Sequence, residues 1–97
     1  MDKLSTVDRE TKLKILLENG WLLDETRDAI TKEFQFKNFI EAFSWMTKIA
    51  FWAEKINHHP EWFNVYRNVT VILTTHDVKG LSSLDLELAS KMDSEAA

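Results

Sequence analysis

The histidines are the residues of this chain best suited to chemistry near neutral pH. The sequence holds three of them, His58, His59 and His76. Imidazole titrates near neutrality, so it can donate or accept a proton there. The adjacent pair stands before the only proline, Pro60, where a helical pattern ends, and His76 follows a strand pattern. The ends of such elements can hold side chains both fixed and accessible. The three could therefore converge on one acid–base cleft, although paired histidines before a proline are often just a helix stop.

Two carboxylates lie where they could act on this group. Glu54 precedes His58 by one helical turn, a spacing that allows the two side chains to touch, although a solvated glutamate on a helix has the same pattern. Asp85 stands three residues after Ser82, as the third residue of a capping box does, and this structural role explains it.

Other site chemistries find little support. Zinc-binding histidines on a helix are usually spaced i, i+4, whereas His58 and His59 are adjacent and point apart. The chain has no cysteine for a disulfide or thiolate site. With only Gly20 and Gly80, it has neither a phosphate-binding loop nor a glycine elbow around a serine. We therefore expect no metal and no cofactor.

Composition indicates an ordinary folded protein. The chain has 97 residues, 44% of them hydrophobic and 29% charged, which predicts a single domain over residues 1–97. A net charge of -4, with no basic stripe, argues against direct binding of nucleic acid. No apolar run approaches the length of a membrane span, and the first residues lack the apolar core of a signal peptide. We expect a cytoplasmic protein without a membrane partner, small enough to enter the nucleus passively.

The first third of the chain predicts a helix followed by two strands. Ser5 and Asp8 form a capping-box pair at the start of the helix, and Gly20 suits the position just past its end. Residues 21–23 form a short strand pattern. Residues 29–36 alternate apolar and polar side chains, as a half-buried strand does.

The longest predicted element is a helix over residues 39–57, opened by Asn38 and Glu41 as a second capping pair. Its apolar residues cover an arc of roughly 180°, wide for one stripe packed on a sheet. Ile40 and Phe51 moreover project from the polar side. A second packing surface, used for self-association, would explain this width. The alternative is that Ile40 and Phe51 are two isolated exposed apolar residues.

The rest of the chain predicts a hairpin and a last helix. Strands over 62–66 and 69–75 are separated by Arg67-Asn68, the length of a two-residue turn. Ser82 and Asp85 then open the final helix as another capping box. The order helix, strand, strand, helix, strand, strand, helix predicts an α+β fold. We expect a two-layer sandwich, with a four-stranded antiparallel sheet and three helices on one face.

One set of residues resembles a known signature. The pattern Glu54, His58-His59-Pro60, Tyr66, then His76 and Asp85 resembles that of the pterin-4a-carbinolamine dehydratase family. The likeness spans about residues 4–89. It also includes Gly20-Trp21, Arg27-Asp28-Ala29-Ile30, Phe36-Lys37-Asn38-Phe39, Thr75-His76 and Gly80-Leu81-Ser82.

The resemblance implies a lyase. Such enzymes dehydrate 4a-hydroxytetrahydrobiopterin to quinonoid dihydrobiopterin in tetrahydrobiopterin recycling, without a metal or a redox cofactor. It implies His58, His59 and His76 as the catalytic group, with Glu54 supporting His58. The implied pterin contacts are Trp21, Glu54, His58, His59, Pro60, Thr75, His76, Asp77 and Val78. Leu84 departs from the family pattern, since animal members often carry a basic residue there.

The resemblance also implies partners. Known members are tetramers in which the long helices form a four-helix bundle, built from dimers that join their sheets. This would make residues 39–56 an interface for a homodimer or homotetramer. An alternative function follows: a dimerisation cofactor and transcriptional coactivator that binds the dimerisation domain of a homeodomain transcription factor, hepatocyte nuclear factor 1, through the same helix.

Overall fold

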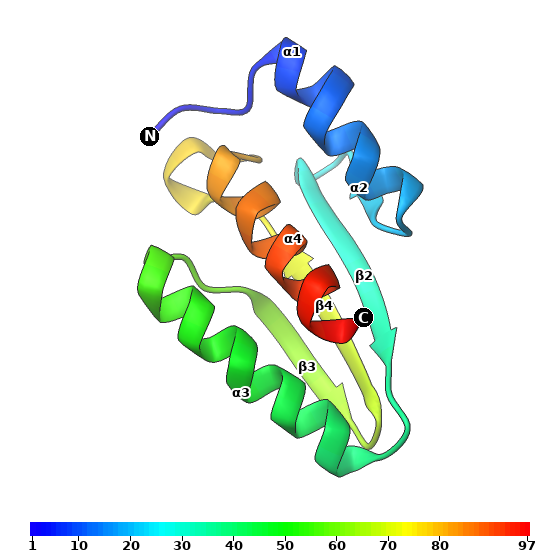
Figure 1. Cartoon of the computed structure of the whole chain (residues 1–97). Helices are drawn as coiled ribbons and strands as arrows, with labels where there is room; N and C mark the ends of the chain where they lie inside the picture. The colour runs from blue at the N-terminus through cyan, green and yellow to red at the C-terminus, as the bar shows by residue number, and fades with distance from the viewer.

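The computed structural model describes all 97 residues (Figure 1). Its elements, in chain order, are α1 (Thr6–Asp8), η1 (Arg9–Leu13), α2 (Lys14–Glu18), β1 (Leu22–Asp24), β2 (Ala29–Gln35), α3 (Phe39–Ile56), β3 (Glu61–Val65), β4 (Asn68–Leu73), η2 (His76–Val78) and α4 (Ser83–Ala96). α1, the π-helical η1 and α2 follow one another without a gap and act as one N-terminal helix. The predicted order of helices and strands is therefore confirmed, with the short 3-10 turn η2 in addition.

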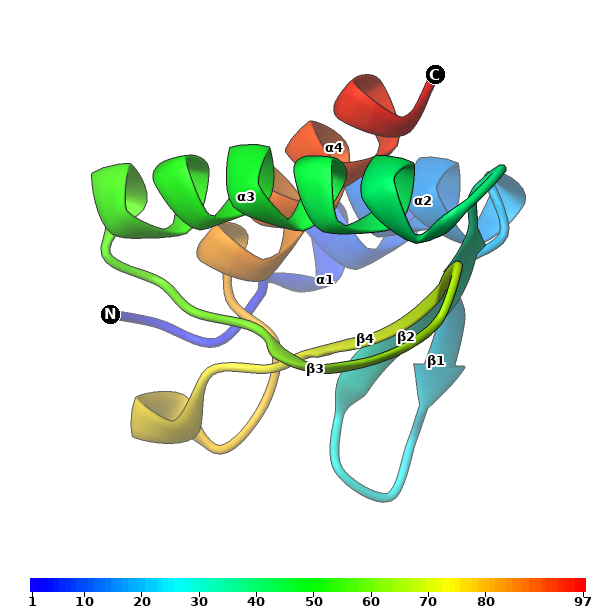
Figure 2. The same ribbon diagram turned by 90° about the horizontal axis from the view of Figure 1, so that it is seen from below.

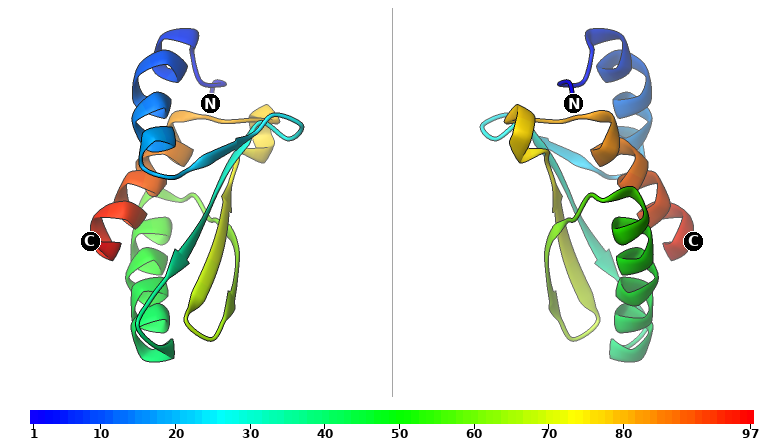
Figure 3. Two further views of the ribbon diagram at one scale, coloured as in Figure 1. Left: turned by 90° about the vertical axis from the view of Figure 1, so that its right-hand side faces the viewer. Right: turned by 90° about the vertical axis from the view of Figure 1, so that its left-hand side faces the viewer.

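The strands form one antiparallel sheet in the order β1-β2-β4-β3. Figures 2 and 3 show all the α-helices on one face of this sheet, with the other face open. The predicted two-layer α+β sandwich is confirmed. None of the helices combines the length and the apolar character needed to span a bilayer.

The core lies between the sheet and the helices because apolar side chains alternate along the strands. Ile30 and Phe34 of β2 are buried, while Glu33 between them is exposed. The other fully or nearly buried core side chains of β4, α3 and α4 are Val69, Val71, Leu73, Ala42, Trp45, Ile49, Ala53, Leu86, Leu88, Ala89 and Met92. Burial of each large side chain contributes about 1.5–3 kcal/mol, so this layer holds the helices on the sheet.

α3 is bounded by two asparagines. The Asn38 side chain accepts a hydrogen bond from the Glu41 backbone N–H at 2.9 Å and opens the helix, as predicted. Asn57 closes the helix in the left-handed conformation, with φ of 53°, one residue later than the last helical residue Ile56. The cap turns the chain sharply away from the helix axis immediately before His58.

The hairpin turn lies one residue earlier than predicted. Val65 pairs with Asn68, so Tyr66-Arg67 rather than Arg67-Asn68 forms the turn. Tyr66 takes a left-handed conformation with φ of 53°. The Asn64 side-chain amide donates to the carbonyls of Tyr66 and Asn68, both at 2.9 Å, and thereby braces the turn. Asn68 is consequently free to join the ladder as the first residue of β4.

Candidate active site

A polar cleft opens where the end of α3, the start of β3 and the end of β4 meet η2. It encloses about 300 Å³. It is lined by Asn57, His58, His59, Glu61, Thr74, Thr75, His76 and Asp77. The three histidines, which are up to eighteen positions apart in the sequence, thus share one cleft, as their places at the ends of elements predicted. None of the lining residues is hydrophobic, so a ligand would be held mainly by hydrogen bonds.

Local backbone structure sets the histidines in place. The His58 backbone N–H donates to the Ala53 carbonyl at 3.0 Å and closes the last turn of α3. On the opposite wall, the Thr75 N–H donates to the Gly80 carbonyl at 2.8 Å, in an isolated antiparallel bridge. This bridge closes the loop that carries His76.

His58 is held by a buried carboxylate. Its Nε2 lies 2.6 Å from Oδ1 of Asp85, and the side chains of His58 and Asp85 are 10% and 0% exposed. The same carboxylate accepts hydrogen bonds from the Thr75 hydroxyl at 2.7 Å and the Ser82 backbone N–H at 2.9 Å. Asp85 therefore completes the predicted capping box of α4 and also holds His58, which lines the cleft, a second role that the capping pattern alone did not reveal.

Glu54 does not contact His58. Its Oε1 lies 2.7 Å from Nε2 of His59, and both of these side chains are more than half exposed. The expected support of His58 by Glu54 is wrong because Asn57 leaves the helical path, so His58 no longer lies one helical turn above Glu54. The His58 ring turns instead toward α4.

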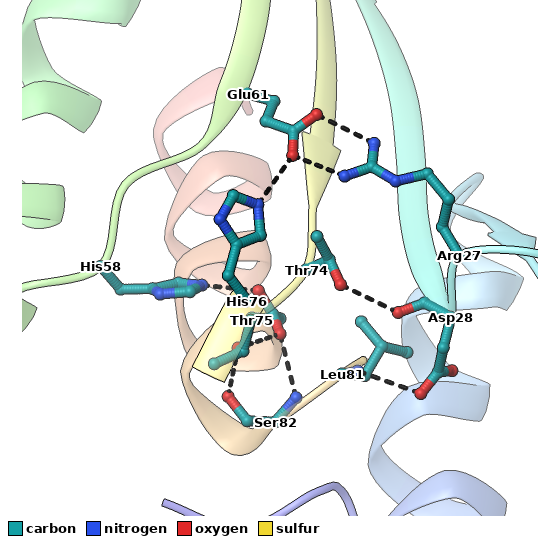
Figure 4. Close-up of polar contacts among 10 residues, drawn as sticks. Arg27, Asp28, His58, Glu61, Thr74, Thr75, His76, Leu81 and Ser82 are labelled. Carbon is teal, nitrogen blue, oxygen red and sulfur yellow. Dashed lines mark hydrogen bonds and ion pairs between the residues drawn. The ribbon is translucent and has the colours of Figure 1, made fainter. Parts of the chain in front are cut away.

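His76 meets a third carboxylate. Its Nε2 lies 3.2 Å from Oε2 of Glu61, the first residue of β3 (Figure 4). The Arg27 guanidinium donates one hydrogen bond to each oxygen of Glu61, at 2.9 and 2.7 Å. These bonds from Arg27, followed by that from His76, lower the pKa of Glu61 from its usual 4.5 to about 2. Glu61 is therefore ionised at neutral pH.

A common pattern emerges from these contacts. Each histidine reaches a carboxylate through Nε2: His58 to Asp85, His59 to Glu54, and His76 to Glu61. An ionised carboxylate only accepts hydrogen bonds, so the contact of His76 with the ionised Glu61 needs a proton on Nε2, and the contacts of His58 and His59 need one there whenever Asp85 and Glu54 are ionised. In the neutral imidazole Nδ1 then carries the lone pair, and in the imidazolium it carries a proton. The three Nδ1 atoms are thus the ones available for proton exchange.

Some residues expected at the site lie elsewhere. Trp21 is 1% exposed in the core, where it packs edge-on against Phe34 and donates through Nε1 to Asp93 at 3.0 Å. It therefore does not wall the cleft. Pro60 and Val78 are neighbours of the lining residues in sequence but are not among them.

Sequence reasoning also missed members of the cleft. Asn57, Glu61 and Thr74 line it without having been singled out. The signal for Glu61 was its place in the strand: it shares the parity of the exposed Phe63 and Val65, and therefore faces away from the core. The structure contains no cluster of three or more histidine, aspartate or glutamate side chains arranged to hold a metal ion.

Comparisons with known proteins agree with the resemblance. Residues 2–95 match the sequence profile described as pterin 4 alpha carbinolamine dehydratase. A relative in Roseobacter denitrificans is 61% identical over 95 residues, which cover 98% of this chain and 97% of the relative. The pterin-4-alpha-carbinolamine dehydratase of Drosophila melanogaster is 54% identical over 94 residues; these make up 97% of this chain and 49% of the fly protein, so the chain spans about half of that relative.

A solved structure shares the fold. The crystal structure of a transcriptional coactivator/pterin dehydratase from Brucella melitensis superposes with a TM-score of 0.89 at 42% sequence identity. The superposition covers 98% of this chain and 99% of the other. With the profile matched over nearly the whole sequence and relatives identical at more than half of the aligned positions, the chain belongs to the pterin 4 alpha carbinolamine dehydratase family.

Proposed function

We propose that this protein is a hydro-lyase that dehydrates 4a-hydroxytetrahydrobiopterin to quinonoid dihydrobiopterin in the recycling of tetrahydrobiopterin. The reaction breaks the C4a–O bond and forms a double bond between N5 and C4a. One group must protonate the departing hydroxyl so that it leaves as water, and another must take the proton from N5. The observation that carries the proposal is the cleft in which three histidines lie together, in a chain that belongs to this family.

The imidazoles suit both halves of the reaction. A neutral ring with Nε2–H bound to its carboxylate offers the Nδ1 lone pair to the N5 proton. A protonated ring offers Nδ1–H to the 4a-hydroxyl. Because imidazole titrates near neutrality, one ring of each kind can be present at the same time. Positioned acid–base groups of this sort typically accelerate proton transfers by about 10²–10⁴-fold.

The three histidines differ in how firmly they are held. The side chain of His58 is 10% exposed and its partner Asp85 is fully buried, whereas the side chains of His59 and His76 are 56% and 78% exposed. We propose that His58 forms the rigid wall of the site, and that His59 and His76 flank the entering pterin. Thr75, Asp77 and Asn57 complete the polar surround, with Pro60, Val78 and Glu54 supporting it from outside. Trp21 has no part in this proposal.

The experiment that tests the function is a stopped-flow assay of dehydration. The substrate is 4a-hydroxytetrahydrobiopterin, generated immediately before mixing by an aromatic amino-acid hydroxylase. We expect the protein to accelerate its loss in proportion to enzyme concentration. A rate equal to that of the uncatalysed reaction at every enzyme concentration would overturn the proposal.

A second candidate function rests on the outer surface of α3. Its side chains Ile40, Phe43 and Phe51 are 75%, 56% and 73% exposed, although they are large and apolar. Such side chains gathered on one helix favour a protein interface. We propose that α3 joins copies of this chain into a homodimer or homotetramer.

Coactivation is the alternative use of that surface. The Brucella melitensis structure is described as a transcriptional coactivator as well as a pterin dehydratase. We propose, as an alternative to the dehydratase function, that α3 binds the dimerisation domain of hepatocyte nuclear factor 1. Calorimetric titration with that domain tests this: heat of binding that Phe51→Glu abolishes would support the role, and no heat with the unaltered chain would refute it.

A further inference from the structure

We propose that Glu61, anchored by Arg27, is a positioning residue for His76: it receives the Nε2–H of the ring and so presents Nδ1 to the cleft. This inference rests on the proposed function. It gives a role to Glu61, which lines the cleft, and adds Arg27, which does not.

The chain of contacts is direct. Figure 4 shows the Arg27 guanidinium facing the Glu61 carboxylate, and that carboxylate facing the His76 ring. The two bonds from Arg27 to Oε1 and Oε2 of Glu61 are 2.9 and 2.7 Å long, and Nε2 of His76 lies 3.2 Å from Oε2. The second ring nitrogen of His76 lies on the side toward His58 in the same view. The contact with Glu61 therefore leaves Nδ1 on the side of the ring that faces His58 in this view.

His76 needs such a partner because its surroundings restrain it little. Its side chain is 78% exposed, so packing does not select a rotamer or a tautomer. The charged and titratable groups that line the hollows around it are His58, His59, Glu61, Asp77, Arg27 and Lys79. Among these, Glu61 alone makes a hydrogen bond to the ring. A single acceptor thus decides which nitrogen carries the proton.

Arg27 gives Glu61 the rigidity that this task requires. A free glutamate at the start of an exposed strand would sample several rotamers, whereas a bidentate guanidinium–carboxylate pair fixes the plane and direction of the carboxylate. Arg27 lies in the turn between β1 and β2, whereas Glu61 is the first residue of β3, so their ion pair links the two opposite edges of the sheet next to the site. Exposed ion pairs contribute little to stability, so loss of the Arg27–Glu61 pair should change the melting temperature only slightly. The test therefore needs readouts other than stability.

The test compares Glu61→Ala, Glu61→Gln and Arg27→Met with a matched control, Glu33→Gln. Glu33 is an exposed glutamate on β2, outside the cleft. The first readout is the tautomer of His76, read from the ¹⁵N shifts of its ring in the full-length protein. We expect a predominant Nε2–H form in the unaltered chain and in Glu33→Gln, and a mixture of both tautomers in Glu61→Ala.

The second readout is kcat and KM for dehydration. We expect Glu61→Ala to lower kcat by about 10-fold with little change in KM, an effect of the size seen when a metal-binding histidine loses its hydrogen-bond partner. Glu61→Gln keeps an amide oxygen that can accept the Nε2–H, so its kcat should recover part of that loss. The kcat of Arg27→Met should lie between those of Glu61→Gln and Glu61→Ala. Glu33→Gln should equal the unaltered chain.

The outcomes separate the two proposals. If the unaltered chain does not accelerate dehydration, the proposed function fails. If it does, but Glu61→Ala keeps either the His76 tautomer or the full kcat, this inference alone is overturned. Equal losses in Glu61→Gln and Glu61→Ala would also overturn it, because the hydrogen-bond acceptor would then not matter.

Discussion

Nε2 of His58 lies 2.6 Å from Oδ1 of Asp85, a residue in the first turn of α4. Since Oδ2 of the same carboxylate binds the Thr75 hydroxyl and the Ser82 backbone N–H, one buried group joins the end of α3, the end of β4 and the start of α4. Such a carboxylate serves folding and orientation at once. It stabilises the helix start, and it leaves His58 a single ring nitrogen for exchange with a ligand.

Replacement of Asp85 by asparagine should therefore affect both stability and rate. The amide has one oxygen in place of two, so at least one of the three hydrogen-bond donors around it loses its acceptor. We expect the free energy of unfolding to fall by about 1–3 kcal/mol, and the dehydration rate by about 10–100-fold. Urea unfolding and the stopped-flow assay measure the two effects. Glu87→Gln, an exposed change on the same helix, is the control; an Asp85→Asn protein that matches it in both assays would contradict this role.

Gly80→Ala should destabilise the loop that carries His76. A Cβ at Gly80 would collide with the carboxylate of Asp28, which accepts hydrogen bonds from Arg9 and from the Leu81 backbone N–H. We expect a loss of about 1–3 kcal/mol, as in other overpacked sites. The check is a double-mutant cycle by urea unfolding. In an Asp28→Ala background the same change should cost much less, and an equal cost in both backgrounds would contradict the collision.

Acid should weaken the fold through Asp28. Its hydrogen bonds from Arg9, and then that from Leu81, hold the pKa of this carboxyl below its usual 3.8. The folded state therefore binds the proton less readily than the unfolded state, so this contribution to stability is complete above about pH 4 and is lost as pH falls through the lower folded-state value. Urea midpoints measured from pH 5 downward should fall less steeply for Asp28→Asn than for the unaltered chain. Parallel curves would refute the linkage.

A charge placed on the outer surface of α3 should disrupt self-association. Phe51→Glu would bury an unpaired carboxylate if this surface lies between copies of the chain, which is strongly unfavourable. We expect sedimentation velocity to show a smaller species for this variant. Ser90→Glu, which adds the same charge to an exposed position on α4, should leave the sedimentation coefficient unchanged. An identical assembly for both variants would exclude the α3 interface.

The fold followed closely from local sequence signals. The asparagine at the start of α3 and the serine at the start of α4 were predicted as caps because their partners stand at fixed spacings along the chain. The turn of the hairpin was misplaced by one residue, because Asn64, a neighbour in the strand, braces Tyr66-Arg67 through its side chain. No spacing rule for turns contains that contact.

The arrangement of the site could be predicted from the sequence only in part. The convergence of the three histidines could be predicted from their places at the ends of elements. Their partners could not, because Asp85 and Glu61 reach His58 and His76 across 27 and 15 positions in the sequence. The misplacement of Trp21 has a similar cause. Its side chain packs against Phe34 in the core and donates a hydrogen bond to Asp93, which is 72 positions away.

The central claim is that the histidines carry out the dehydration, and single substitutions test it most directly. The measurement is the stopped-flow rate of 4a-hydroxytetrahydrobiopterin dehydration by the unaltered chain, His58→Ala, His59→Ala and His76→Ala, each first shown by circular dichroism to be folded. We predict that the unaltered chain exceeds the uncatalysed rate, and that His58→Ala and His76→Ala lose about 10²-fold or more of kcat. Full activity in both of these folded variants would contradict the account.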